Sequence, residues 1–191
     1  MKWVCQRALL LLAGMGTQAA WAHAGSAAGW LHPLTGIDHF LAMVAVGAWS
    51  CQIGGRAIWI VPSAFVGCML LGGLAGFEQI ELPWIEIGVA ASVVLLGLAI
   101  GLAQTFPVAI ASAGVGLFGC FHGYAHGYEM PVMEDKLGYV AGFLATTATL
   151  HLIGAFGAHG LLKRDAGGRI LRGLGFASAL AGVWLVSLTL F

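Results

Sequence analysis

Two short stretches hold most of the side chains that could do chemistry in this chain of 191 residues. The first, HPLTGIDH at 32–39, has the pattern H-x5-D-H, and the second is FHGYAHGYE at 121–129. Imidazole and carboxylate groups together suit nickel, cobalt, zinc or iron. Each ionisable group placed within an apolar segment costs roughly 3 kcal/mol, so such groups call for a functional reason.

The second stretch places its ionisable side chains on one face of a helix. Positions i, i+4 and i+7 share a face, so His122, His126 and Glu129 can point the same way. The alternative is that these histidines hydrogen-bond across helices and only hold the bundle together. Two histidines and an acid on one face favour metal ligands.

The first stretch contains Asp38 and His39 near the expected start of a helix. Thr35 and Asp38 have the spacing of a capping box, in which Asp38 satisfies backbone N–H groups. Asp38 could also bind a metal directly, or orient the neighbouring imidazole of His39. Capping and metal binding are compatible, so the role of Asp38 stays open between these three.

The composition determines which elements must position these residues. Hydrophobic residues make up 60% of the chain and charged residues 8%, and the mean hydropathy is +0.93. Such an apolar excess must face lipid. The zero net charge and the lack of a basic patch exclude nucleic acid as a partner. We therefore predict an all-α membrane protein, a six-helix transmembrane bundle that follows a cleaved signal peptide.

Residues 1–22 have the features of a secretory signal peptide. Lys2 and Arg7 precede a short apolar run, and Ala20-Trp21-Ala22 fits the cleavage rule. The alternative, an uncleaved first helix, is disfavoured because the run is short. Residues 23–191 would then form one transmembrane domain. Its predicted spans are 36–53, 57–76, 84–104, 107–128, 137–161 and 170–190. Glycines at four-residue spacing, such as Gly119, Gly123 and Gly127, predict close helix packing.

The charges of the loops predict an orientation in the bacterial inner membrane. With a cleaved signal peptide the mature N-terminus is periplasmic, and the inner loops hold five of the six basic residues after residue 30: Arg56, Lys163, Arg164, Arg169 and Arg172. Asp38 and His39 then lie near the outer end of the first span. His122 lies about 22 Å along the fourth span, also in its outer part. Both stretches should therefore meet at one depth and share an ion.

Four further residues are weaker candidates for metal binding. His23, the new N-terminus, could chelate through its amine and imidazole. Met43 lies one turn from His39, and Glu86 begins the third span, where an acid also complements the helix dipole. His151 lies deeper and could belong to an exit path, or it could simply hydrogen-bond to Thr147 one turn away.

Taken together, the H-x5-D-H and F-H-G-x-A-H-G-x-E patterns resemble those of the HupE/UreJ family of hydrogenase and urease accessory membrane proteins. The resemblance extends to the signal peptide, the histidine after it and the six spans. It implies a secondary transporter of nickel or cobalt. By resemblance, the metal-handling residues are His32, Asp38, His39, His122, His126 and Glu129.

The predicted function is a permease for Ni²⁺ or Co²⁺ that serves a metalloenzyme such as hydrogenase or urease. The chain has no Walker A sequence to hydrolyse ATP, and no tightly bound cofactor or enzymatic activity is expected. The main alternative is an intramembrane zinc hydrolase that uses the same side chains. A haem-binding electron carrier is disfavoured, because His122 and His126 on one helix cannot sandwich a haem. Homo-oligomerisation and the identity of the recipient enzyme stay open.

Overall fold

The structure is a computed structural model that describes residues 26–130 and 135–190. The predicted signal peptide and His23 lie outside the described residues. Every regular element described is a helix, which confirms the all-α class. The helices are α2 (Ser26–Thr35), α3 (Ile37–Ile53), α4 (Ala57–Phe77), α5 (Ile85–Gly101), α6 (Val108–Glu129), α7 (Lys136–Leu162) and α8 (Gly167–Leu190).

Helices α3 to α8 agree with the six predicted spans to within three residues at each end. Among the described residues, however, only α4, α6, α7 and α8 are each long and apolar enough to cross a membrane. The bent pair of α2 and α3 would count as a fifth span. Helix α5 is shorter, with 17 residues, because the chain turns after Gly101, and Ala103 adopts a positive φ of 52°. The structure thus supports four or five candidate spans.

Helix α2 was not predicted, and it divides the first histidine stretch between two helices. The axes of α2 and α3 differ by 87° across Gly36. The Thr35 hydroxyl donates to the carbonyls of Leu31 and His32, both at 3.2 Å, so it belongs to the end of α2. Gly36 precedes α3 without any side-chain cap. The predicted capping box is therefore wrong, because the hydroxyl that it requires is used by the preceding helix.

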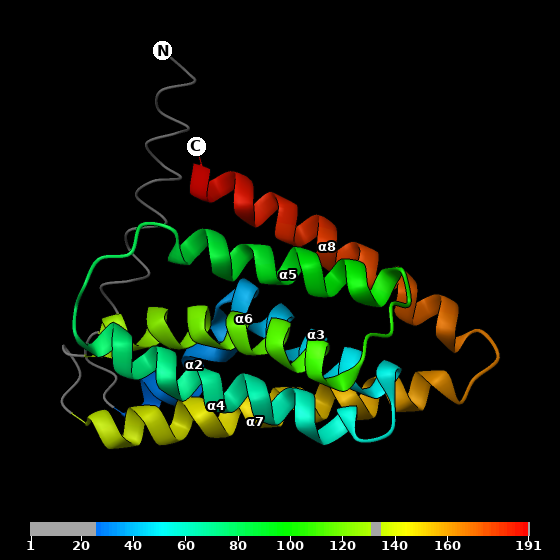
Figure 1. Ribbon diagram of the computed structural model, residues 1–191, viewed down its shortest axis with the longest axis horizontal. Coiled ribbons are helices and arrows are strands. Elements are labelled where there is room, and N and C mark those ends of the chain that lie inside the picture. The colour runs from blue at the N-terminus through cyan, green and yellow to red at the C-terminus, as the bar shows by residue number, and fades with distance from the viewer. Residues whose placement is uncertain (1–25, 131–134, 191) are drawn as a thin grey trace, which may run out of the picture.

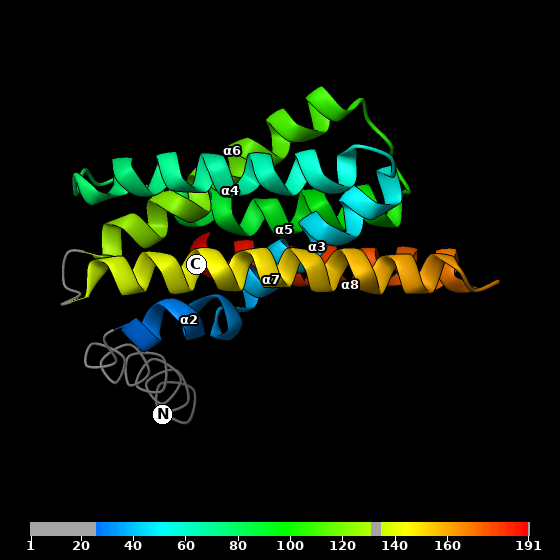
Figure 2. The same ribbon diagram turned by 90° about the horizontal axis from the view of Figure 1, so that it is seen from below.

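Helices α4 and α6 form the closest pair in the bundle (Figure 2). Glycines allow this approach: a Cβ atom added at any of the three positions would collide with a backbone carbonyl of α4. The three positions are Gly119, Gly123 and Gly127, and the carbonyls belong to Phe65, Met69 and Gly73. The predicted role of this glycine stripe in packing is confirmed.

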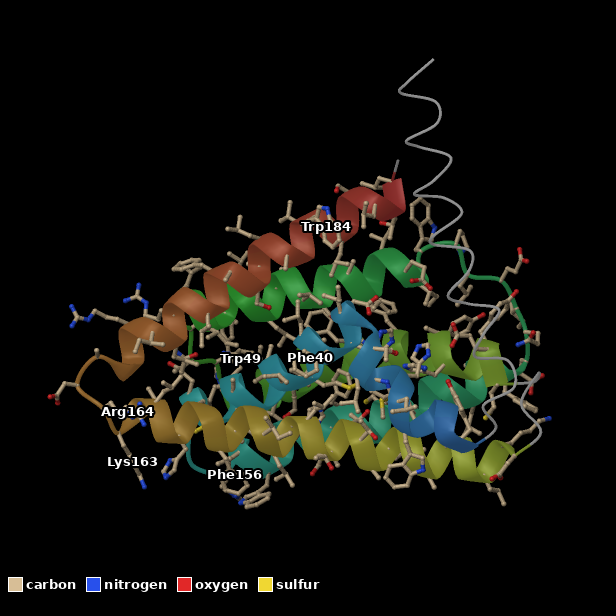
Figure 3. The ribbon with its side chains drawn as sticks, turned by 180° about the vertical axis from the view of Figure 1, so that it is seen from behind. Phe40, Trp49, Phe156, Lys163, Arg164 and Trp184 are labelled. Atoms are coloured by element: carbon tan, nitrogen blue, oxygen red, sulfur yellow. The ribbon has the colours of Figure 1, made fainter. Side chains whose placement is uncertain are left out.

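The other long helices pair as α5 with α8 and α3 with α7, while α2 lies on α7 (Figures 1 and 2). Helix α3 lies in the middle and supplies much of the buried core, including Met43 and Val46. Figure 3 shows Lys163 and Arg164 beside the connection from α7 to α8, at the opposite end of the bundle from α2. The basic end and the histidine-rich end are therefore separated by the length of the bundle.

Candidate metal centre

Four histidines from three helices lie side by side at the α2 end of the bundle, each in contact with at least one other. They are His32 of α2, His39 of α3, and His122 and His126 of α6, and we call them the histidine cluster. The His39 ring lies 4.5 Å from the His126 ring and 4.7 Å from the His122 ring, measured between centroids. The His32 and His126 rings are also 4.7 Å apart. The two predicted stretches therefore meet, as expected.

Three members of the cluster are close enough to share one ion. One ring nitrogen each of His32, His39 and His126 lies within 4.8 Å of the others. Two nitrogens bound to one metal at about 2.1 Å can be no more than about 4.2 Å apart. Small side-chain rotations would therefore bring these three imidazoles to ligand distance.

Each of the buried imidazoles is held through one nitrogen, and its other nitrogen is free. The Nδ1–H of His39 donates to Oδ1 of Asp38 at 2.7 Å. His122 Nε2 lies 3.0 Å from the Ser92 hydroxyl, and His126 Nδ1 lies 3.2 Å from the Tyr139 hydroxyl. The opposite nitrogens find no hydrogen-bond partner among the described residues. These unpaired atoms are His39 Nε2, His122 Nδ1 and His126 Nε2.

The hydrogen bonds around Ser92 show that the unpaired nitrogen of His122, Nδ1, carries a lone pair rather than a proton. The single hydroxyl proton of Ser92 is donated to the Val89 carbonyl at 2.6 Å. The Ser92 oxygen can then only accept, so His122 donates its Nε2–H and keeps Nδ1 unprotonated. A buried acceptor without a partner costs about 1–3 kcal/mol. His39 Nε2 is unprotonated as well, because Nδ1 carries the proton donated to Asp38, and two such lone pairs in one cluster fit a site for a cation.

Asp38 acts on His39 through both of its recorded hydrogen bonds. Its Oδ1 accepts the backbone N–H of His39 and the ring Nδ1–H, each at 2.7 Å. A carboxylate that binds one imidazole nitrogen fixes the ring orientation and makes the other nitrogen a better metal ligand. Of the three roles left open for Asp38, this geometry favours the orientation of His39.

Glu129 lies at the edge of the cluster rather than inside it. Its Oε2 is 3.8 Å from His32 Nε2, and its side chain is about half exposed. Glu129 also lines a cavity of about 440 Å³ together with Glu81 and Glu86, which we call the acidic cavity. The candidate residue Glu86 is therefore near the site but outside the histidine cluster. Carboxylates around this opening would attract cations to His32.

The remaining candidates, Met43 and His151, lie deeper in the bundle. Met43 is fully buried, and its sulfur accepts a hydrogen bond from the Thr147 hydroxyl at 3.3 Å. The hydroxyl proton of Thr147 therefore goes to Met43, and the described residues show no hydrogen bond between Thr147 and His151. His151 is separated from the histidine cluster by the ring of Phe65.

Sequence reasoning missed the two hydroxyls that hold the imidazoles of α6. Ser92 had a visible signal, because it is the only polar side chain in α5 after Glu86. Tyr139 had none, since an aromatic residue near a helix start resembles an ordinary membrane-interface residue.

Comparisons with known proteins agree with these motifs. The family described as "HupE / UreJ protein" matches residues 4–185. The chain is 48% identical over 162 residues to "Protein HupE" of Rhizobium leguminosarum bv. viciae, which covers 85% of this chain and 84% of that protein. No solved structure matches.

Proposed function

The chain belongs to the HupE/UreJ family, and on that premise we propose that it is a secondary permease for a divalent transition metal. Nickel is the proposed substrate and cobalt the alternative. The ion would supply the maturation of a metalloenzyme such as a hydrogenase or a urease.

The observation that carries this proposal is the group of three imidazoles, of His32, His39 and His126, whose ring nitrogens lie within 4.8 Å of one another, with His122 in contact with His39. His39, His122 and His126 are each anchored by an oxygen on one side and unpaired on the other. Imidazole nitrogens suit nickel, cobalt and zinc better than magnesium or calcium. Neutral ligands with one carboxylate nearby would bind such an ion without trapping it, as passage requires.

We further propose that all six long helices cross the bacterial inner membrane, after removal of residues 1–22. Helix α5 is about 26 Å long at 1.5 Å per residue, close to the thickness of the hydrocarbon core, and it packs along α8. The basic end with Lys163 and Arg164 faces the cytoplasm under the positive-inside rule. The histidine cluster and the mature N-terminus then face the periplasm.

In the proposed mechanism, the ion enters through the acidic cavity and exchanges its water for imidazole. Glu129 lies beside His32, which makes this pair the first contact. His126 contacts both His32 and His39, so it can pass the ion inward. His122 lies beyond His39 and is fully buried, so it is the innermost ligand of the cluster.

Accumulation of radioactive nickel in cells tests this function. We expect His122→Ala and His126→Ala to lower uptake at least tenfold relative to the wild type. The control is Thr149→Ala, which removes an exposed hydroxyl of α7 outside both cavities and should change uptake less than twofold. Equal uptake with and without the protein would overturn the proposal. Hydrolysis of a peptide or lipid by the purified protein would then favour the zinc hydrolase.

A further inference from the structure

A second cavity lies in the other half of the bundle, between α4 and α7. It has a volume of about 660 Å³, is partly open, and is lined mainly by apolar side chains of the first half of α4 and the second half of α7, together with Ser63, His151 and His159. Both of these segments lead to the basic end, where Arg56 and Lys163 lie. At roughly 30 Å³ per water molecule, the cavity has room for a hydrated cation. We call it the inner cavity.

His151 lines the inner cavity and is buried, with 3% of its surface exposed. Its Nε2 has no hydrogen-bond partner within the part of the chain that the structure describes. Helix packing places it well below the histidine cluster, because the His151 carbonyl lies against Gly47 of α3. Gly47 is eight residues beyond His39, so His151 lies about 12 Å further along the bundle.

The ring of Phe65 contacts both His151 and the histidine cluster. The Phe65 ring is 5.5 Å from the His122 ring on one side and 5.1 Å from the His151 ring on the other. Phe65 is fully buried, so no open passage runs around it. Pro62, three residues earlier in α4, has no N–H and so leaves the Ile58 carbonyl without its helical bond. Helix α4 therefore has a local weak point beside this ring.

We propose that His151 is a second, inner metal site that receives the ion from His122, and that the Phe65 ring is the barrier between the two sites. This inference rests on the proposed transport function and adds an inward route to it. Movement of one phenyl ring would connect two imidazoles that each have an unpaired nitrogen. The ion would then leave through the inner cavity toward the basic end.

The inner site has fewer ligands than the outer site, which favours release of the ion toward the basic end. The outer site offers three imidazoles within reach of one ion, whereas the inner cavity offers the buried imidazole of His151, the exposed one of His159 and room for water. Water can replace ligands as the ion moves outward from His151, so binding there is weak and release is fast. The exposed His159 also lines the inner cavity, about two helical turns nearer the basic end, so it lies on this route.

The test separates binding at the outer site from passage through the membrane. Full-length protein carrying His151→Gln is compared with wild type in two assays, nickel binding to purified protein and nickel uptake by cells. We expect binding within twofold of wild type and uptake reduced at least tenfold. Thr149→Ala, a change on an exposed part of the same helix and outside the inner cavity, should leave both within twofold.

Substitutions of Phe65 test the barrier. Phe65→Trp enlarges the ring and should lower uptake at least tenfold while binding persists, and retained binding also shows that the variant folds. Phe65→Leu keeps an apolar side chain that is smaller, so uptake should equal or exceed that of the wild type. If Phe65→Trp does not fold, the result for His151→Gln decides.

Normal uptake by His151→Gln, together with loss of uptake in His122→Ala, would overturn the inner site and leave the transport function standing. Absence of nickel uptake by the wild type would overturn both.

Discussion

Replacement of Asp38 by asparagine distinguishes two roles of this residue: orienting His39 as a metal ligand, or only stabilising the start of α3. Asparagine keeps an oxygen in the same place and can still accept from the backbone N–H of His39. It removes the negative charge that faces the ring Nδ1–H at 2.7 Å. That distance is typical of a charge-assisted hydrogen bond, which is about twice as strong as a neutral one.

The expected loss follows from this difference. Removing a carboxylate behind a metal-binding histidine weakens metal affinity by roughly 10–100-fold, or about 1.4–2.8 kcal/mol. The Asp38 side chain is one-quarter exposed, so solvent already screens part of its charge. We therefore expect nickel affinity to fall in the lower part of that range, by roughly 10–30-fold.

Calorimetric titration of purified protein with Ni²⁺ measures this loss, and uptake of radioactive nickel by cells should fall in parallel. The matched control is Glu78→Gln, which removes one exposed carboxylate at the same end of the bundle and outside the acidic cavity. We expect it to change affinity less than twofold. If Asp38→Asn binds and transports nickel as the wild type does, Asp38 only complements the dipole of α3, and our account of His39 is wrong.

Three further predictions follow from the same geometry. Tyr139→Phe removes the hydroxyl beside His126 and should weaken nickel binding about fivefold by calorimetry, or about 1 kcal/mol; unchanged affinity would show that the hydroxyl does not orient the ring. Gly123→Ala should lower the melting temperature, because its Cβ would collide with the Met69 carbonyl, whereas Gly114→Ala meets no atom within 4 Å and should not. Equal melting temperatures would contradict the close packing. Nickel uptake should fall mainly as the pH drops toward 4, because protons compete with metal for imidazole and burial lowers the pKa of His32, the proposed first ligand, to about 4; uptake that rises steadily below about pH 6 would contradict this.

The long helices could be predicted from the sequence because each is a continuous apolar run with its own punctuation. Helix α2 could not, since ten residues with a central proline and only moderate hydropathy do not form a recognisable span. The assignment of Thr35 failed for a related reason. Its hydroxyl can serve the helix before it or the helix after it, and only the 87° bend at Gly36 decides which.

The residues of the candidate site could be predicted from the sequence, but the hydrogen bonds that hold their imidazoles could not. The motifs and the alternation of spans were enough to expect that His39 and His122 lie at the same depth. Which nitrogen each ring leaves free depends on Ser92 and Tyr139, which come from helices distant in sequence. Nothing local to those residues reveals that contact.

The sequence alone determined that this chain is an apolar bundle with metal-competent side chains at one end and basic residues at the other. It could do so because hydropathy and charge are properties of neighbouring residues. Only the tertiary structure decided that α4 packs on α6 and α3 on α7, and that Phe65 lies between His122 and His151. Those contacts depend on which apolar faces fit together, and almost every face of such a chain is apolar.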